Sequence, residues 1–320
     1  MFRLGLFLLG GTSVASLLAW VMGVASFSTT FLLVTLPGQV GLVAMALAIR
    51  RRAPEVRTLL VAGLLGGLMG TLAYDLVRVP FVMAGFRVLA PIDSYGVLAA
   101  GAQTSSAWTG LLGWSFHFAN GIGFGIAYAM LAPRRAWTWG IAWGLLLETV
   151  TIVTPFATTY GLVGGRSGTN WFAIGIAYAA HVPYGAAVGI AVQRRRDLVG
   201  SLAPPGRPTV PLVILLVVVG LVQWQAPWRS GLSTEGAAAA DGPSAVVVDG
   251  VFHPEWLRVA VNGCVTLVNR DPQAWSIGLG DDTVTLAPGA TSMCFPDAGV
   301  HRVRTSERPY AGGFVIVDPQ

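Results

Sequence analysis

Long apolar runs separated by short polar stretches make up the first two thirds of the chain. A helix needs about 20 apolar residues to cross the roughly 30 Å hydrocarbon core of a bilayer. The pattern predicts seven such helices, at Leu4–Ala25, Phe31–Ile49, Leu59–Val79, Ala107–Leu131, Trp137–Phe156, Trp171–Val192 and Val210–Trp224. Between the third and fourth, Pro91 and Asp93 interrupt the stretch Phe81–Gly101, which is predicted to be re-entrant or interfacial.

The last third of the chain changes to short apolar runs bounded by Gly, Pro, Asn and Asp. This pattern is typical of strands in an all-β domain, and it predicts a β-sandwich. The expected strands are Val246–Val248, Leu257–Val261, Val265–Asn269, Trp275–Leu279, Thr283–Leu286, Ser292–Phe295, Val300–Arg304 and Phe314–Val317. The predicted organisation is a six-span bundle (1–200), a linker with the seventh helix (201–229), a flexible Gly/Ala/Ser-rich tether (230–243) and a β domain (244–320).

Composition supports a membrane protein. Of the 320 residues, 54% are hydrophobic and only 11% are charged, so a wholly soluble protein is excluded. Every basic residue is an arginine, and the net charge is +5. The arginines form short clusters between apolar runs without interleaved aromatic residues, which argues against nucleic acid as a partner and for the lipid bilayer.

The positions of the arginines predict the orientation. Basic residues in short loops stay in the cytoplasm, and the clusters Arg50–Arg52, Arg134–Arg135 and Arg194–Arg196 follow the second, fourth and sixth predicted helices. The N-terminus is therefore expected inside the cytoplasmic membrane, with the β domain periplasmic or extracellular. A cleaved signal peptide is an alternative for the first helix, and it leaves the orientation of the rest unchanged.

Glycines recur at four-residue spacing inside the predicted helices. Gly63 with Gly67, and Gly66 with Gly70, are examples, and Gly121, Gly123 and Gly125 lie close together. In a bilayer such residues let helix backbones approach closely.

No phosphate-binding loop, Ser-His-Asp constellation or cysteine nucleophile is recognisable, so hydrolase and kinase functions have no residues to support them.

Several ionisable residues interrupt the predicted helices. An ionisable side chain inside a bilayer is unfavourable by a few kcal/mol, so it suggests function and requires a partner. A rise of about 1.5 Å per residue places His117, Glu148 and His181 at similar depth, with Asn120 and Tyr184 near them in sequence. Two further ionisable residues, Asp75 and Arg78, lie three residues apart on one face of the third predicted helix and are expected to pair.

Three interpretations of His117, Glu148 and His181 remain open. They can form a hydrogen-bonded network that fixes helix register, or a path for protons or a solute. They can also ligate a metal ion, or the two histidines can hold a haem. No His-Glu-x-x-His spacing ties these residues together, so the sequence does not choose among the three.

The β region resembles the cupredoxin family between Val246 and Val317. The resemblance depends on an ordered series of motifs: Phe252-His253-Pro254, Leu257-Arg258-Val259, Gly263-Cys264-Val265-Thr266, Asn269-Arg270-Asp271, Leu286-Ala287-Pro288-Gly289, Phe295-Pro296-Asp297-Ala298-Gly299 and Gly313-Phe314-Val315-Ile316-Val317. It implies a Greek-key β-sandwich with a copper site made by two histidines, a cysteine and a methionine.

The copper-ligand positions that the resemblance implies carry other residues. They are occupied by Trp275, Thr305, Arg308 and Ala311, none of which supplies a thiolate or imidazole. We therefore expect neither blue copper nor electron transfer in this domain. Trp275, Arg308 and Tyr310 could instead present an aromatic and cationic tip to an extracytoplasmic protein partner.

The two cysteines of the chain, Cys264 and Cys294, both lie in the β region. In the cupredoxin arrangement their strands pair antiparallel and place them opposite one another, which implies a disulfide suited to an oxidising compartment. The alternatives are two buried thiols, or a minor soft-metal site with Met293.

Three functions follow from these observations. The favoured one is non-enzymatic: a multi-pass membrane protein displays a metal-free cupredoxin-like domain that docks or stabilises a partner. The first alternative is a membrane redox, metal or haem protein that uses His117, Glu148 and His181. The second is a transporter or proton path that also includes Asp75.

Overall fold

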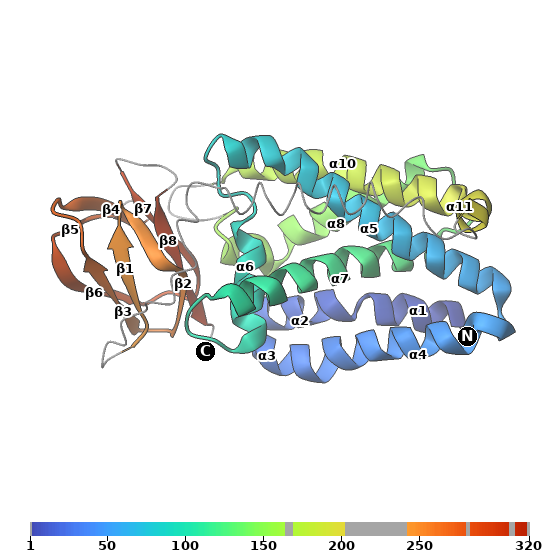
Figure 1. The fold of residues 1–320 in the computed structure, drawn as a ribbon, viewed down its shortest axis with the longest axis horizontal. Coiled ribbons are helices and arrows are strands. Elements are labelled where there is room, and N and C mark those ends of the chain that lie inside the picture. The colour runs from blue at the N-terminus through green and yellow to red at the C-terminus, as the bar shows by residue number, and fades with distance from the viewer. Residues whose placement is uncertain (1, 164–168, 202–241, 280–281, 307–310, 319–320) are drawn as a thin grey trace.

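A computed structural model describes residues 2–163, 169–201, 242–279, 282–306 and 311–318. A bundle of helices and a β domain lie end to end (Figure 1). The N-terminus and helix α11 (Arg195–Ser201) lie at the end of the bundle that is farthest from the β domain. The seventh predicted helix, most of the tether, Arg308 and Tyr310 fall outside the described residues.

The helices follow the predicted apolar runs closely. They are α1 (Phe2–Gly10), α2 (Thr12–Val21), α3 (Phe27–Thr30), the π-helical η1 (Phe31–Thr35), α4 (Leu36–Arg52), α5 (Pro54–Met83), α6 (Ala90–Ala100), α7 (Ala107–Leu131), α8 (Thr138–Val153), α9 (Pro155–Thr159) and α10 (Trp171–Gln193). The interrupted stretch before Gly101 contains α6, a short helix that packs against α7.

The expectation of seven membrane spans is not supported. Among the described residues, three helical segments are long and apolar enough to cross a bilayer: Phe27–Ile49, Pro54–Met83 and Trp171–Gln193. A fourth results if α1 and α2, which meet at a 42° bend, count as one span. Helix α8 has only 16 residues, and His117 and Asn120 lower the hydropathy of α7.

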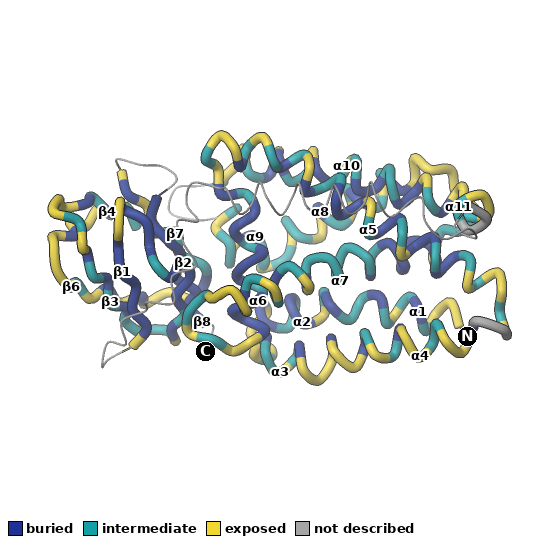
Figure 2. The backbone as a smooth tube through the Cα atoms, in the orientation of Figure 1, coloured by how far each residue is buried: buried dark blue, intermediate teal, exposed yellow. Residues whose placement is uncertain are grey.

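Large apolar side chains cover the outside of the bundle. Leu33, Val40 and Leu47 of the η1–α4 segment are each more than half exposed, and exposed positions run along α4 in Figure 2. An apolar surface of this extent in water would be unfavourable, whereas in lipid it needs no cover. The three candidate spans and this surface both indicate a membrane protein.

Glycines bring α5 and α7 into backbone contact. A Cβ atom added at Gly67 would lie 2.7 Å from the Gly121 carbonyl oxygen, and one added at Gly125 would lie 2.6 Å from Gly67 Cα. Real Cβ atoms do not approach other atoms so closely. The predicted role of these glycines in helix packing is confirmed.

All eight predicted strands are present. They are β1 (Ser244–Val248), β2 (Val251–Ala260), β3 (Gly263–Asn269), β4 (Trp275–Leu279), β5 (Asp282–Leu286), β6 (Gly289–Phe295), β7 (Gly299–Thr305) and β8 (Gly312–Asp318). Instead of two separate sheets, they form one hydrogen-bonded series in the order β5-β4-β7-β8-β2-β1-β3-β6. The β1–β3 and β2–β8 pairs are parallel, and the others are antiparallel.

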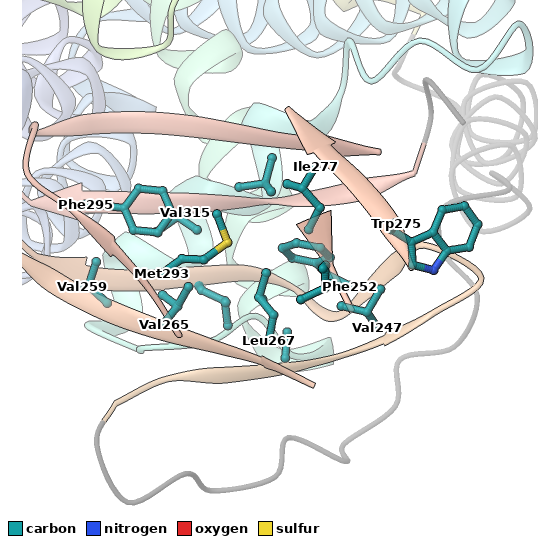
Figure 3. Close-up of a cluster of buried hydrophobic side chains, with 14 of the residues drawn as sticks. Val247, Phe252, Val259, Val265, Leu267, Trp275, Ile277, Met293, Phe295 and Val315 are labelled. Carbon is teal, nitrogen blue, oxygen red and sulfur yellow. The ribbon is translucent and has the colours of Figure 1, made fainter. Parts of the chain in front are cut away.

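Side chains alternate along the strands between two buried environments. On β8, Val315 and Val317 join the core of the β domain, whereas Phe314 and Ile316 pack with residues of the bundle. Figure 3 shows Val315 beside Met293 and Phe295 inside the β domain. Because successive side chains of a strand point to opposite faces, one strand serves both contacts.

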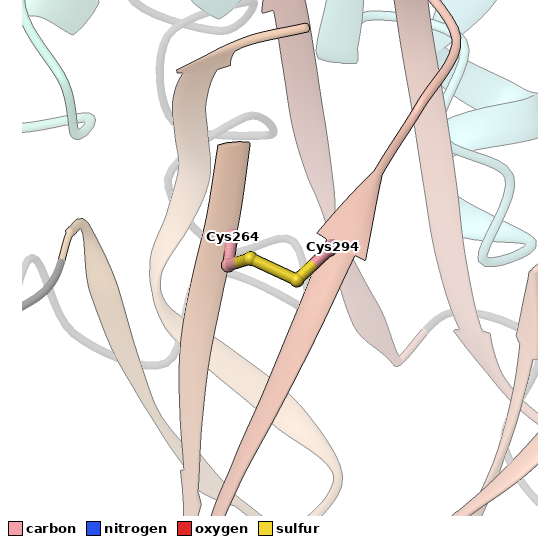
Figure 4. The surroundings of a disulfide bond; sticks show 2 residues. All are labelled: Cys264 and Cys294. Carbon is pink, nitrogen blue, oxygen red and sulfur yellow. A yellow bond between two sulfur atoms is a disulfide. The ribbon is translucent and has the colours of Figure 1, made fainter. Parts of the chain in front are cut away.

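A disulfide joins Cys264 and Cys294, as the cupredoxin resemblance implies (Figure 4). The two cysteines are directly paired in the antiparallel β3–β6 ladder. The bond closes a sequence separation of 30 residues across neighbouring strands. It therefore constrains the edge of the sheet that ends in β6.

The β domain is bonded directly to the end of the bundle. The Ser105 amide donates to the Trp256 carbonyl oxygen at 2.9 Å, and the Trp256 amide donates to Ser105 Oγ at 3.0 Å. The Arg258 amide donates to the Gln103 carbonyl oxygen at 2.8 Å. These contacts link β2 to the segment between α6 and α7, so the two parts meet through a specific interface.

Candidate functional site

A cavity of about 1120 Å³ lies between the helices and continues to the β domain. Helices α2, α5, α7, α8 and α10 line its inner part, and strands β6 and β7 line its outer part. Ligand pockets are typically about 300–1,000 Å³, so this cavity is large enough for an organic molecule. The polar residues singled out in the predicted helices, except Asp75, contribute to its lining.

Glu148 of α8 and His181 of α10 form one polar pair in the inner part of the cavity. His181 Nδ1 lies 3.3 Å from Glu148 Oε2 and 2.9 Å from the Ala177 carbonyl oxygen. Glu148 is only 3% exposed, and its Oε1 has no hydrogen-bond partner among the described residues. A buried carboxyl oxygen without a partner is unfavourable, so this atom is a candidate contact for a ligand.

Asp75 of α5 and His117 of α7 form a second pair. His117 Nε2 lies 3.1 Å and 3.2 Å from the two carboxyl oxygens of Asp75, which is completely buried. Arg78 Nη1 lies 3.8 Å from the same carboxylate, on the next turn of α5. The predicted Asp75–Arg78 proximity is thus observed, together with a histidine that sequence spacing did not assign to it.

Tyr74 lies between the two pairs. Its ring centroid is 4.8 Å from that of His181 and 6.1 Å from that of His117, and the Arg78 guanidinium lies 4.9 Å over it. The sequence placed His117, Glu148 and His181 at one depth as a single cluster. The structure instead divides them into two carboxylate–imidazole pairs, with Tyr74 packed against both histidines.

Asn120 and Tyr184 hold neighbouring helices together beside these pairs. Ser13 Oγ donates to Asn120 Oδ1 at 2.9 Å, and the Tyr184 hydroxyl donates to the Gly121 carbonyl oxygen at 2.7 Å. Both residues also line the cavity. Each of them therefore links two helices and also gives the cavity wall a polar group.

The donor set for a metal ion is incomplete in the described part of the chain. No three His, Cys, Asp or Glu side chains come together there as a metal-binding group. His117 and His181 each already contact a carboxylate, and Tyr74 packs against both rings. Metal or haem binding by His117 and His181 stays a prediction. Proton exchange between the carboxylate and the imidazole of each pair needs no movement of the side chains.

The outer end of the cavity is lined by arginine and aromatic side chains. The Phe314 ring stacks on Trp256 with centroids 4.3 Å apart, and the Arg87 and Arg302 guanidinium carbons lie 5.2 Å and 6.0 Å from the Phe314 centroid. Arg87 Nη1 also lies 3.3 Å from Glu255 Oε1. Cation–π contacts of this kind stabilise guanidinium groups away from water.

Burial disfavours the charge on both of these arginines. Burial is the main cause that lowers the pKa of Arg87, and the carboxylates of Glu255 and Asp93 oppose it. Burial, with repulsion from Arg304 and Arg87, lowers the pKa of Arg302 to about 9, again against Glu255. The charged side chains that line the outer end of the cavity are those of Arg87, Arg302, Arg304 and Asp297.

The positions at which the cupredoxin resemblance implies copper ligands are buried where the structure describes them. Trp275 is 2% exposed and donates its Nε1 hydrogen to Asp271 Oδ2 at 2.7 Å. Thr305 is 1% exposed and Ala311 is completely buried, while Arg308 lies outside the described residues. Trp275 is thus unavailable for the partner-binding tip that the sequence suggested, because its side chain lies inside the domain.

Sequence reasoning missed the outer residues Trp256, Arg302 and Phe314. Arg302 and Arg304 alternate with Val303 and Thr305, a pattern that predicts a solvent-facing side of a strand. In the structure that side of β7 faces the bundle, where Val300 packs with bundle residues. Only the docking of the two parts shows that these side chains line a cavity.

Among known proteins, only solved structures match this chain. No protein-family model and no curated protein matches the chain. Solved structures of amicyanin variants are similar: a reduced form, 20% identical, covers 25% of this chain and 86% of its own with a TM-score of 0.23. An oxidized form is 20% identical and covers 26% of this chain and 86% of its own, with a TM-score of 0.23. Another reduced form is 22% identical and covers 26% of this chain and 87% of its own, with a TM-score of 0.22. At these values the similarity assigns no function.

Proposed function

We propose that this chain is a multi-pass membrane protein that binds a small molecule in the cavity between its helices, with the β domain as a metal-free, cupredoxin-like cap. The observation that carries the proposal is the joint lining of one cavity by the bundle and the β domain. The unpartnered Oε1 of Glu148 supports a ligand there, because it supplies a buried polar contact. In this proposal the cap docks on the helical bundle of its own chain.

The proposed topology places the cap outside the cytoplasmic membrane. In Figure 1 the N-terminus and α11, which adjoins the Arg194–Arg196 cluster, lie at the end opposite the β domain. This separation agrees with the positive-inside rule. A disulfide in the β domain supports the same orientation, because such bonds persist in oxidising compartments.

Native mass spectrometry of the full chain in a neutral detergent tests ligand binding. Thr151 and Thr149 lie two residues apart on α8, but only Thr151 lines the cavity, and Thr149 is exposed. We expect the wild-type protein and Thr149→Trp to retain a small-molecule adduct, and Thr151→Trp to lose it. An adduct absent from the wild-type protein, or retained equally in both variants, would contradict the proposal.

A second candidate function is proton transfer through the inner cavity. The observation that favours it is the series of contacts from the Asp75–His117 pair through Tyr74 to the His181–Glu148 pair, across the four helices α5, α7, α8 and α10. In proteoliposomes, proton flux that falls in Glu148→Gln and in His117→Gln would support this function. Equal flux in the wild-type protein and both variants would rule it out.

A further inference from the structure

Four side chains make a continuous site at the outer end of the cavity. Trp256 and Phe314 stack with an interplanar angle of 11°, and the guanidinium groups of Arg87 and Arg302 lie over Phe314. All four line the cavity. They come from β2, β7, β8 and the connection between α5 and α6, so the site exists only when the cap is docked.

The charge of this site favours an anion. Arg302 is repelled by Arg304 and by Arg87, and the attraction of Glu255 opposes this repulsion. Arg304 and Asp297 also line the cavity, so the charged side chains that line its outer end are three arginines and one aspartate. A carboxylate or phosphate beside a partly desolvated guanidinium forms short, charge-assisted hydrogen bonds, which are about twice as strong as neutral ones. An anionic group bound here would offset the mutual repulsion of the arginines.

An independent observation at Trp256 points to an acceptor atom. Trp256 is 1% exposed, and its Nε1 has no hydrogen-bond partner among the described residues. A buried N–H group without an acceptor loses its hydration and gains nothing in return. An oxygen of a molecule in the cavity that Trp256 lines would supply the missing acceptor.

The cavity continues from this site between apolar side chains of the helices. Leu17 and Leu18 of α2, Phe124 of α7 and Leu146 and Leu147 of α8 contribute to its walls. We propose that the outer end of the cavity binds the carboxylate or phosphate group of an amphiphile whose apolar body lies between the helices. This inference rests on the proposed function, because it names the class of the ligand.

Titration of the full chain with dodecyl phosphate, in a neutral maltoside detergent, tests this inference. We expect saturable binding, and weaker binding by about tenfold in Arg302→Gln because one charge-assisted contact is lost. Arg302→Lys keeps the charge and is expected to bind with intermediate affinity. Arg258→Gln is the matched control, because Arg258 belongs to the same sheet but pairs with Asp318 at 2.9 Å and does not line the cavity.

Trp256→Phe separates binding from folding. It keeps an aromatic ring beside Phe314 and removes the N–H group, so the empty protein is expected to remain as stable as the wild type while dodecyl phosphate binds more weakly. Dodecyltrimethylammonium, with the same chain and a cationic head, is expected not to compete. Inorganic phosphate is expected to compete only weakly, because it lacks the chain.

Three results would overturn the inference. They are equal binding of the cationic amphiphile, unchanged affinity in both Arg302→Gln and Trp256→Phe, and inorganic phosphate binding as tightly as dodecyl phosphate. The last result would show a free-anion site instead of an amphiphile site. None of the three affects the Thr149→Trp and Thr151→Trp comparison, so the proposed function and this inference fail separately.

Discussion

Arg87 and Glu255 form an ion pair that joins the two parts of the molecule. Arg87 Nη1 lies 3.3 Å from Glu255 Oε1, and the two side chains are 1% and 14% exposed. Arg87 lies between α5 and α6, whereas Glu255 lies on β2. Because both groups are withdrawn from water at the interface, the loss of one removes a buried opposite charge from beside the other.

Removing the carboxylate should therefore destabilise the docked cap more than removing both charges. We expect Glu255→Leu to lower the free energy of unfolding by about 3 kcal/mol, and Arg87→Met with Glu255→Leu to recover much of that loss. Thermal unfolding of the full chain, followed by tryptophan fluorescence, measures both effects. A double variant that is less stable than Glu255→Leu would contradict the explanation.

The Arg258–Asp318 pair is the control for this comparison. Its atoms are as close as 2.9 Å, but the Asp318 side chain is 29% exposed. Ion pairs accessible to solvent contribute about 0–1 kcal/mol. Arg258→Gln should thus change the unfolding temperature little, although it removes an equally well-formed pair.

The backbone contact between α5 and α7 predicts a position that tolerates no side chain. At Gly67, a Cβ atom would lie 2.7 Å from both the Gly121 carbonyl oxygen and Ile122 Cα. Overpacking usually destabilises by about 1–3 kcal/mol, and backbone atoms cannot move aside as a side chain can. We expect Gly67→Val to reduce the yield of folded protein in detergent and to lower its melting temperature by several degrees.

Gly175 on α10 provides a matched comparison. An added Cβ atom there meets nothing within 4 Å, and alanine favours a helix over glycine by about 1 kcal/mol. Gly175→Ala should therefore be neutral or slightly stabilising. If Gly67→Val and Gly175→Ala have the same effect in size-exclusion chromatography and thermal unfolding, close helix packing is not the reason for Gly67.

The strands were predictable because each carries its own signal. Along β3, Val265 and Leu267 are buried in the core, while Thr266 and Val268 alternate with them and are less buried. This period of two identifies a strand without knowledge of its neighbours. Strand pairing is a long-range property. The one pairing that was predicted, which places Cys264 opposite Cys294, came from the cupredoxin resemblance.

The helical part was less predictable because apolar runs do not specify how helices bend or rotate. Leu4–Ala25 reads as one helix, but the structure divides it into α1 and α2 with a 42° bend. The depth of a residue along a helix follows from the rise per residue. Whether His117 points toward Asp75 depends instead on how α7 is rotated about its axis relative to α5. The outer cavity depends on docking between distant segments, for which the sequence carries no local pattern.

Loss of the Cys264–Cys294 disulfide should destabilise the cap. In the chain-entropy model, a cross-link over 30 residues contributes about 3 to 4 kcal/mol, because it restricts the unfolded chain. We expect the variant with Cys264→Ser and Cys294→Ser to melt at a lower temperature than the oxidised wild-type protein. The wild-type protein should approach this variant when dithiothreitol is added, and the variant itself should not respond to dithiothreitol.

Trp275 stands where the cupredoxin resemblance implies a copper-ligating histidine, and its substitution tests whether that position is now structural. The side chain is 2% exposed, and its Nε1 donates to Asp271 Oδ2. Asp271 in turn accepts from the backbone amides of Asp249 and Gly250 at 3.0 Å and 3.2 Å, so the indole is tied to the β1–β2 turn.

Trp275→Ala should lower the free energy of unfolding by about 3–5 kcal/mol, because it leaves a cavity and removes a buried hydrogen bond. Trp275→His should be destabilising as well, because an imidazole fills less of the space. Gln273→Ala, at an exposed neighbouring position, should have little effect. These changes can be measured by thermal unfolding with and without added copper. A Trp275→His variant as stable as the wild-type protein, or stabilised by stoichiometric copper, would show that the position can act as a ligand site.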